Sequence, residues 1–179
     1  SQDRKKKGGI KVHTNIHANE FVPSDIKFTS AATNDSFMLK PANYNDGDII
    51  AMDRAYIDYA WFEELTNRGV TYVTKMKKNL VYDTLSDTMY MLPCGLMECR
   101  VQVVEFRKHI KGGENIKHKA RIVTYVDPAK KKAKVISLLT NDMTMEVEDI
   151  IDIYRQRWEI ELLFKQLKQN FPLKYFYGE

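Results

Sequence analysis

A long amphipathic helix near the end of the sequence constrains the fold more than any other feature. Its apolar side chains recur at helical spacing, and the pattern continues to about Asn170: Val147, Ile150, Ile151, Tyr154 and Trp158. We expect Thr144 to be the N-cap, followed by acidic side chains that the helix dipole favours on a first turn. The sequence therefore predicts one long helix whose apolar side chains, Trp158 included, face the protein core.

Strands and further helices are predicted ahead of this helix, and together they indicate an α/β fold. The run Asp48–Asp53 is mostly apolar, which suits a central strand buried on both faces, with Asp53 at its C-terminal end. Tyr59–Asn67 is predicted as a helix that Gly69 closes. A helix is also expected at Ser30–Leu39, and strands are expected at Ile10–Ile16, Asp25–Thr29, Val70–Met76 and Val135–Thr140.

The central part of the chain has a different pattern. Short alternating runs such as Val101–Phe106 and Ala120–Val126 are separated by turn residues, which favours an antiparallel β subdomain. Because this region lies between two α/β stretches, we interpret it as an insertion into one domain. The expected organisation is a first core part at residues 1–76, the inserted subdomain at 77–134, and the last core strand with the final helix at 135–179.

The composition excludes several classes of protein. Hydrophobic residues make up 44% of the chain and charged residues 29%, which is typical of a soluble globular protein. No stretch approaches the roughly 18 apolar residues of a membrane span, and the N-terminal segment lacks the apolar run of a signal peptide. Cys94 and Cys99 are the only cysteines, and their spacing does not match a zinc motif. We expect a cytoplasmic protein with two reduced thiols.

Positive charge is concentrated in two stretches, although the net charge is only +4. The stretch from Arg107 to Lys134 contains ten Lys or Arg residues against two acids. A second cluster consists of Arg4, Lys5, Lys6 and Lys7. Blocks of this kind suit a polyanion such as DNA, and merely solvated charge is an equal alternative for either cluster alone.

Four polar residues of the final helix share one stripe: Tyr154, Arg157, Glu161 and Lys168. At about 100° per residue they fall within about 60° of each other, along roughly 21 Å of helix. One interpretation is a salt-bridged surface, since Glu161 and Lys165 have the favourable i,i+4 spacing. Lys168 lies two turns from Glu161 and cannot pair with it directly. A functional stripe is the second interpretation, and the geometry leaves both open.

The spacing of these four residues matches in full the Y-(2)-R-(3)-E-(6)-K signature of a large group of bacterial insertion-sequence transposases. The segments Arg4–Thr14 and Asp53–Tyr56 also resemble this group, which places a catalytic Asp at the end of a strand. The chain is thus similar to DDE transposases along nearly its whole length. The resemblance implies an RNase H-like mixed sheet flanked by helices and interrupted by the inserted β subdomain.

The resemblance also implies a chemistry for each residue. Asp53 and Glu161 would be catalytic carboxylates that bind Mg²⁺, or Mn²⁺ as a substitute, in DNA strand cleavage and strand transfer. Tyr154, Arg157 and Lys168 would hold DNA phosphates near the cut, and the cluster of Lys5, Lys6 and Lys7 would add DNA contacts. The expected partners are double-stranded DNA, at transposon ends and target, and a second copy in the DNA complex.

The first carboxylate of the triad has no match in this sequence. The earliest predicted strand, Ile10–Ile16, carries no acid, so we expect the first strand of the fold and its Asp to lie upstream of this fragment. The fragment alone should then cleave little or no DNA, and should bind duplex DNA weakly and more weakly as salt rises. An inactive DNA-binding remnant is the alternative function, and a related nuclease without a joining step is a third.

Overall fold

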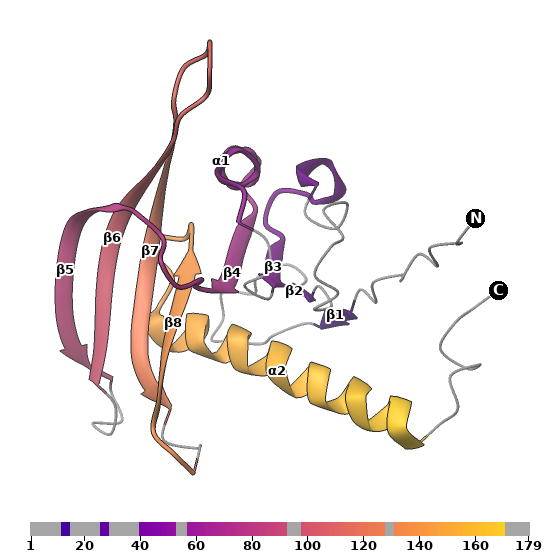
Figure 1. Cartoon of the computed structure of the whole chain (residues 1–179). Coiled ribbons are helices and arrows are strands. Elements are labelled where there is room, and N and C mark those ends of the chain that lie inside the picture. Colours follow the sequence, from indigo (N-terminus) through magenta and orange to yellow (C-terminus); the bar gives the residue numbers. More distant parts are fainter. Residues whose placement is uncertain are drawn as a thin grey trace, which may run out of the picture.

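The computed structural model describes residues 12–14, 26–28, 40–52, 57–92, 98–127 and 131–170. Only the backbone is described for residues 12–14, 26–28, 90, 161, 164 and 168. The elements follow in chain order (Figure 1): β1 (Val12–Thr14), β2 (Ile26–Phe28), the 3-10 helix η2 (Pro41–Asn43), β3 (Ile49–Met52), α1 (Tyr59–Asn67), β4 (Thr71–Lys75), β5 (Asp83–Met91), β6 (Glu98–Lys108), β7 (Ile116–Asp127), β8 (Lys134–Thr140) and α2 (Val147–Asn170).

The strands form one mixed sheet in the order β1-β2-β3-β4-β8-β7-β6-β5. The pairs β2–β3 and β3–β4 are parallel, and all other neighbours in this sheet are antiparallel. The register pairs Met52 with Thr74 and Thr74 with Leu139, so β8 lies beside β4 although 58 residues separate the two strands in the sequence. The predicted α/β class with a mixed sheet is confirmed, and the RNase H-like topology stays a prediction.

Two cores form on the two faces of this sheet, because alternate residues of each strand point to opposite faces. Ile49 and Ala51 pack in the cluster that contains Ile150 and Tyr154 of α2. Ile50 and Met52 pack in the other cluster, with Phe62 and Leu65 of α1. All four residues of β3 are buried, as expected for a central strand that helices cover on both sides.

Helix α1 begins and ends where the sequence predicts. The Asp58 carboxylate caps its start by accepting a hydrogen bond from the Trp61 backbone N–H at 3.2 Å. Gly69 follows its end with φ +73°, a conformation that residues with a Cβ rarely adopt. A Cβ added there would stand 2.0 Å from Oδ1 of Asp46. Gly69 therefore closes the helix mainly for a conformational reason, since the exposed Asp46 side chain can move away from an added Cβ.

The start of α2 differs from the prediction. Thr144 is not the N-cap, since the helix begins at Val147 and its first backbone hydrogen bonds are accepted by the Glu146 carbonyl. Oδ1 of Asp142 instead organises the preceding turn, accepting from the backbone N–H groups of Thr144 at 2.9 Å and Met145 at 2.8 Å. Helix α2 is described as far as Asn170, so the helix predicted to about this residue is present over its described length.

Trp158 is a second correction, because its side chain is 45% exposed rather than buried. Figure 1 shows the C-terminal half of α2 extending beyond the sheet. Leu162 and Leu163 on this half are also exposed, at 42% and 53%. The helical pattern alone marked Trp158 as a core residue, and its exposure shows that this prediction was wrong.

The other sequence predictions divide into three groups. The strands at residues 49–52, 71–75 and 134–140 lie within one or two residues of their predicted bounds. The antiparallel pattern predicted within residues 77–134 is confirmed by β5, β6 and β7, which continue the same sheet, and the status of this region as an inserted subdomain stays a prediction. The helix expected at residues 30–39 lies outside the described residues.

Candidate active site

The polar stripe of α2 starts inside the protein. Arg157 is 2% exposed and is among the largest fully buried side chains, while Tyr154 is 9% exposed. Tyr154 packs in the cluster formed by α2 with β3 and β8. Burial of both residues excludes the interpretation that this half of the stripe is a solvated salt-bridged surface. A guanidinium costs several kcal/mol to remove from water, so its position needs a specific compensation.

The second half of the stripe is described by its backbone alone. Glu161 and Lys168 lie within the uninterrupted helix α2, and their side chains are not described. At about 1.5 Å per residue, Glu161 lies about 6 Å along the axis from Arg157, and Lys168 about 10 Å further on. The predicted alignment of the four Cα positions along one helix is therefore present.

Asp53 to Tyr56 lie outside the described residues. Asp53 directly follows Met52, the last residue of β3, and in sequence it continues the spacing of Ile49 and Ala51, which face α2. Lys5, Lys6 and Lys7 also lie outside the described residues. The structure thus brings β3 and the buried part of α2 into one sheet–helix layer.

Two contacts hold α2 against the sheet on this face. The Arg121 guanidinium of β7 donates to the Met145 carbonyl at 2.5 Å, just ahead of the helix. Arg155 forms an ion pair with Asp127 at 3.8 Å, at the end of β7. Burial is the largest cause that raises the pKa of the neighbouring Tyr125 hydroxyl, which therefore remains protonated. These contacts fix the position of the helix that carries the polar stripe.

A buried hydrogen-bonded group on the opposite face was missed by the sequence prediction. His118 of β7 is fully buried, and its Nδ1 lies 2.5 Å from Oε1 of Glu63 on α1. Its Nε2 contacts the hydroxyl of Tyr72 on β4. A neutral imidazole with its proton on Nδ1 satisfies both contacts, since it donates to Glu63 and accepts from Tyr72.

The surroundings favour that neutral state. Burial lowers the pKa of His118, against the opposing effect of the hydrogen bond to Glu63, and burial likewise raises the pKa of Tyr72 well above its usual range. Phe62 and Tyr59 lie beside the imidazole ring. The alternation of β7 could have predicted that His118 faces the core, but no sequence pattern links it to Glu63 or Tyr72, 55 and 46 residues away.

The part of the chain that the structure describes contains no group of three or more His, Cys, Asp or Glu side chains that could hold a metal ion. Cys99 is buried and forms no disulfide, and Cys94 is outside this part. No helix within the described ranges is long and apolar enough to cross a membrane.

Comparison with known proteins matches the chain to one family. The family described as "Transposase DDE domain" matches residues 1–174. A Sinorhizobium fredii protein named as a transposase is 25% identical over 170 residues, covering 95% of this chain and 47% of its own. A Geobacillus stearothermophilus protein, named as a transposase for insertion sequence element IS5377, is 22% identical over 97% of this chain and 44% of its own.

A third relative, from Synechocystis sp., is named as a transposase for insertion sequence element IS4SA. It is 27% identical over 72% of this chain and 33% of its own length. The chain therefore spans about half or less of the length of these relatives.

Proposed function

The chain belongs to the transposase DDE domain family, and on this basis we propose that it is part of the catalytic core of a metal-dependent insertion-sequence transposase. The proposed reaction nicks the ends of a DNA element and joins the free 3′ hydroxyl to target DNA. We further propose that the core has the RNase H-like arrangement and that two copies assemble around the DNA ends.

The observation that carries this proposal is the signature spacing of Tyr154 and Arg157 on α2, the helix that packs against β3. A guanidinium in surroundings with little water binds phosphate oxygens strongly and can do so in bidentate fashion. We assign Arg157 and Tyr154 to holding a DNA phosphate near the cut. Lys168, further along α2, would add a point charge to the same strand.

Asp53 and Glu161 are the proposed metal ligands and catalytic carboxylates. Their donor set fits Mg²⁺ or Mn²⁺, because both supply the hard oxygen ligands that these ions prefer. When bound, such ions activate the attacking oxygen and stabilise the leaving oxygen of a phosphodiester. The chain contributes by presenting one carboxylate after β3 and one on α2, the two elements that pack together. The third carboxylate of a DDE triad is not assigned.

The test is strand cleavage by the intact protein in Mg²⁺ or Mn²⁺. We expect Asp53→Asn and Glu161→Gln each to lower the rate at least about 100-fold, because a lost metal ligand removes several kcal/mol of transition-state stabilisation. Glu159→Gln is the matched control, since it removes an exposed carboxylate from the same helix. Undiminished cleavage by either variant would refute the assignment.

The alternative, an inactive DNA-binding remnant, predicts a different pattern. In that case the unsubstituted protein binds duplex DNA but does not cleave it in either metal. This alternative is favoured by the predicted strand Ile10–Ile16, which has no acid that could be the first carboxylate of the triad.

A further inference from the structure

One end of the sheet carries exposed lysines close to the C-terminal ends of β3 and β4. Parallel β3 and β4 finish at the same end, and the register of β8 with β4 and β7 shows that β7 also finishes there, where β8 begins. The segments that follow or precede these strand ends carry exposed lysines, which we call the basic edge: Lys77, Lys78, Lys131, Lys132 and Lys134.

The opposite end carries acids beside β3 and β4, in addition to the lysines of the β6–β7 hairpin. Asp46 and Asp48 precede β3, and Asp142 follows β8. The backbone N–H of Thr71, at the start of β4, donates to the Asp48 carbonyl at 2.9 Å, and the Thr71 hydroxyl lies 3.5 Å from Asp142. These acids therefore lie together at the end where β3 and β4 begin.

Little within the described residues neutralises the basic edge. Among the described residues, no acid lies within 4.0 Å of the charged nitrogen of any of its five lysines. The acid at the end of β7, Asp127, is 7% exposed and pairs with Arg155. Glu98, at the start of β6, is the nearest exposed acid on the neighbouring strand. Clustered like charges of this kind produce a local field that attracts a polyanion.

We propose that DNA entering or leaving the active site runs across this basic edge, which contacts its phosphates. This inference rests on the proposed function, because Asp53 follows β3 and β3 finishes at this same end. Lysines suit such a role, since they bind phosphate as point charges without reading base sequence. Strands β7 and β8 continue beyond the end of β4. The Met76 N–H donates to the Ser137 carbonyl at 2.9 Å, so the two lysine segments follow and precede neighbouring strands.

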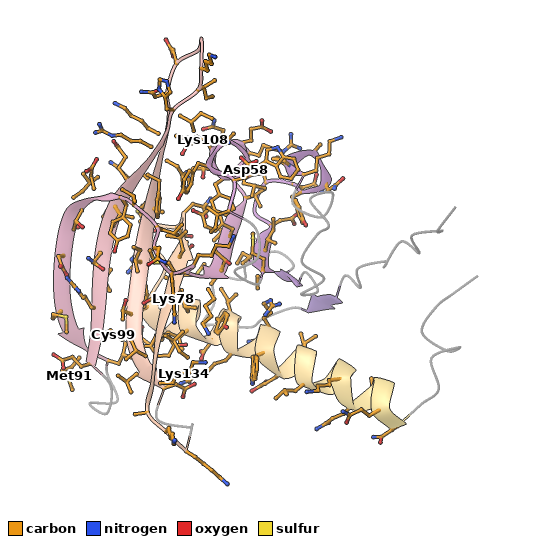
Figure 2. The ribbon with its side chains drawn as sticks, viewed as in Figure 1. Asp58, Lys78, Met91, Cys99, Lys108 and Lys134 are labelled. Atoms are coloured by element: carbon orange, nitrogen blue, oxygen red, sulfur yellow. The ribbon has the colours of Figure 1, made fainter. Side chains whose placement is uncertain are left out.

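A second set of exposed lysines provides the competing surface. Lys108, Lys111, Lys117 and Lys119 belong to the β6–β7 hairpin. Figure 2 shows Lys108 and Lys134 towards opposite ends of the sheet, with Lys78 between them and nearer to Lys134. The basic stretch Arg107–Lys134 therefore divides between the two ends of β7, and only its last part lies on the side of the proposed active site.

The experiment compares two variants with the same change in net charge. One replaces Lys77, Lys78, Lys132 and Lys134 by Gln, and the other replaces Lys108, Lys111, Lys117 and Lys119 by Gln. Binding of the 179-residue chain to a short fluorescent duplex of mixed sequence is measured over a salt series without divalent metal. All eight side chains are exposed, so circular dichroism should show the same fold for both variants.

We expect the basic-edge variant to bind DNA at least about 10-fold more weakly. The slope of the logarithm of the binding constant against the logarithm of the salt concentration should also fall by up to about 4, near 1 for each lost phosphate contact. The hairpin variant should retain most of the affinity and of the slope. Equal losses would mean that binding follows net charge alone, and a larger loss in the hairpin variant would place the DNA at the other end. Either result overturns the proposal, as does absence of binding by the unsubstituted chain.

These outcomes are separable from those of the proposed function. Asp53→Asn and Glu161→Gln test cleavage while leaving the basic edge unchanged. A chain that fails the cleavage test can still show basic-edge binding, and a chain that passes it can still bind DNA through the hairpin.

Discussion

At the scale of single residues, burial separates side chains that share a sequence pattern. Arg157 and Trp158 are neighbours on α2, yet the charged side chain is buried and the aromatic one is 45% exposed. His118 shows the same separation on β7, where the flanking Lys117 and Lys119 are exposed. In each case the neighbouring elements decide the environment, because a polar group becomes stable inside only where it finds specific partners.

Tyr72→Phe tests the buried group around His118. The change removes the hydroxyl that Nε2 of His118 contacts, so a buried acceptor loses its donor. We expect the free energy of unfolding to fall by about 1–3 kcal/mol in urea titrations. Tyr59→Phe is the control, because the ring stacked on Phe106 remains, and it should cost less than about 0.5 kcal/mol. Equal effects of the two substitutions would contradict the role of the Tyr72 hydroxyl.

At the scale of elements, the start of α2 depends on the preceding turn, Asp142–Met145, which the helical pattern did not predict. The Asp142 carboxylate holds this turn through two backbone N–H groups and contacts the hydroxyls of Thr144 and Thr71. Thr144 thus donates to the capping group rather than acting as one. The turn directs α2 from the end of β8 back across the face that contains Ile49 and Ala51.

Asp142→Ala and Thr144→Ala distinguish these two roles. We expect Asp142→Ala to lower the free energy of unfolding by about 1 kcal/mol, since the turn loses its acceptor. Thr144→Ala keeps both backbone hydrogen bonds and should cost less than half as much. Thermal and urea unfolding provide the measurement, and a larger loss for Thr144→Ala would restore it as the cap.

At the scale of the whole molecule, the sheet separates two different surroundings. The face with α2 carries the stripe assigned to DNA, and the face with α1 carries the Glu63–His118–Tyr72 group. That group links α1, β4 and β7, so its protonation affects the stability of the fold rather than one element. The exposed lysines lie at both ends of this sheet, and the basic edge is the end that we propose for the DNA contact.

The stability of the fold should depend on pH through His118. Burial lowers its pKa in the folded protein, so the folded state resists a proton that the unfolded chain accepts near the ordinary value of about 6.5. The stabilisation is complete above that pH and is lost as pH falls below it, with a slope of up to about 1.4 kcal/mol per pH unit. Asp149 and Asp152, whose pKa values burial raises, act with the opposite sign at lower pH.

Urea unfolding between neutral and mildly acidic pH measures this dependence. His118→Gln should flatten the dependence, while His109→Gln, in an exposed hairpin position, should leave it unchanged. An unchanged slope in His118→Gln would show that other groups bind the protons.

The sequence by itself determined the local elements of this protein. The bounds of α1, the buried strand β3 and the strand β8 all follow from short-range periodicity and from residues such as Gly69. The signature spacing Tyr154, Arg157, Glu161 and Lys168 is also local, because one helix carries all four residues. Such features depend on neighbours a few residues away, so they can be predicted from the sequence alone.

Only the tertiary structure decided which of these residues are buried and which elements meet. The pairing of β8 with β4, the contact of His118 with Glu63 and Tyr72, and the exposure of Trp158 all depend on residues distant in sequence. The same holds for the division of one basic stretch between two ends of a sheet. Periodicity fixes the face of a helix or strand, but packing alone fixes what lies against that face.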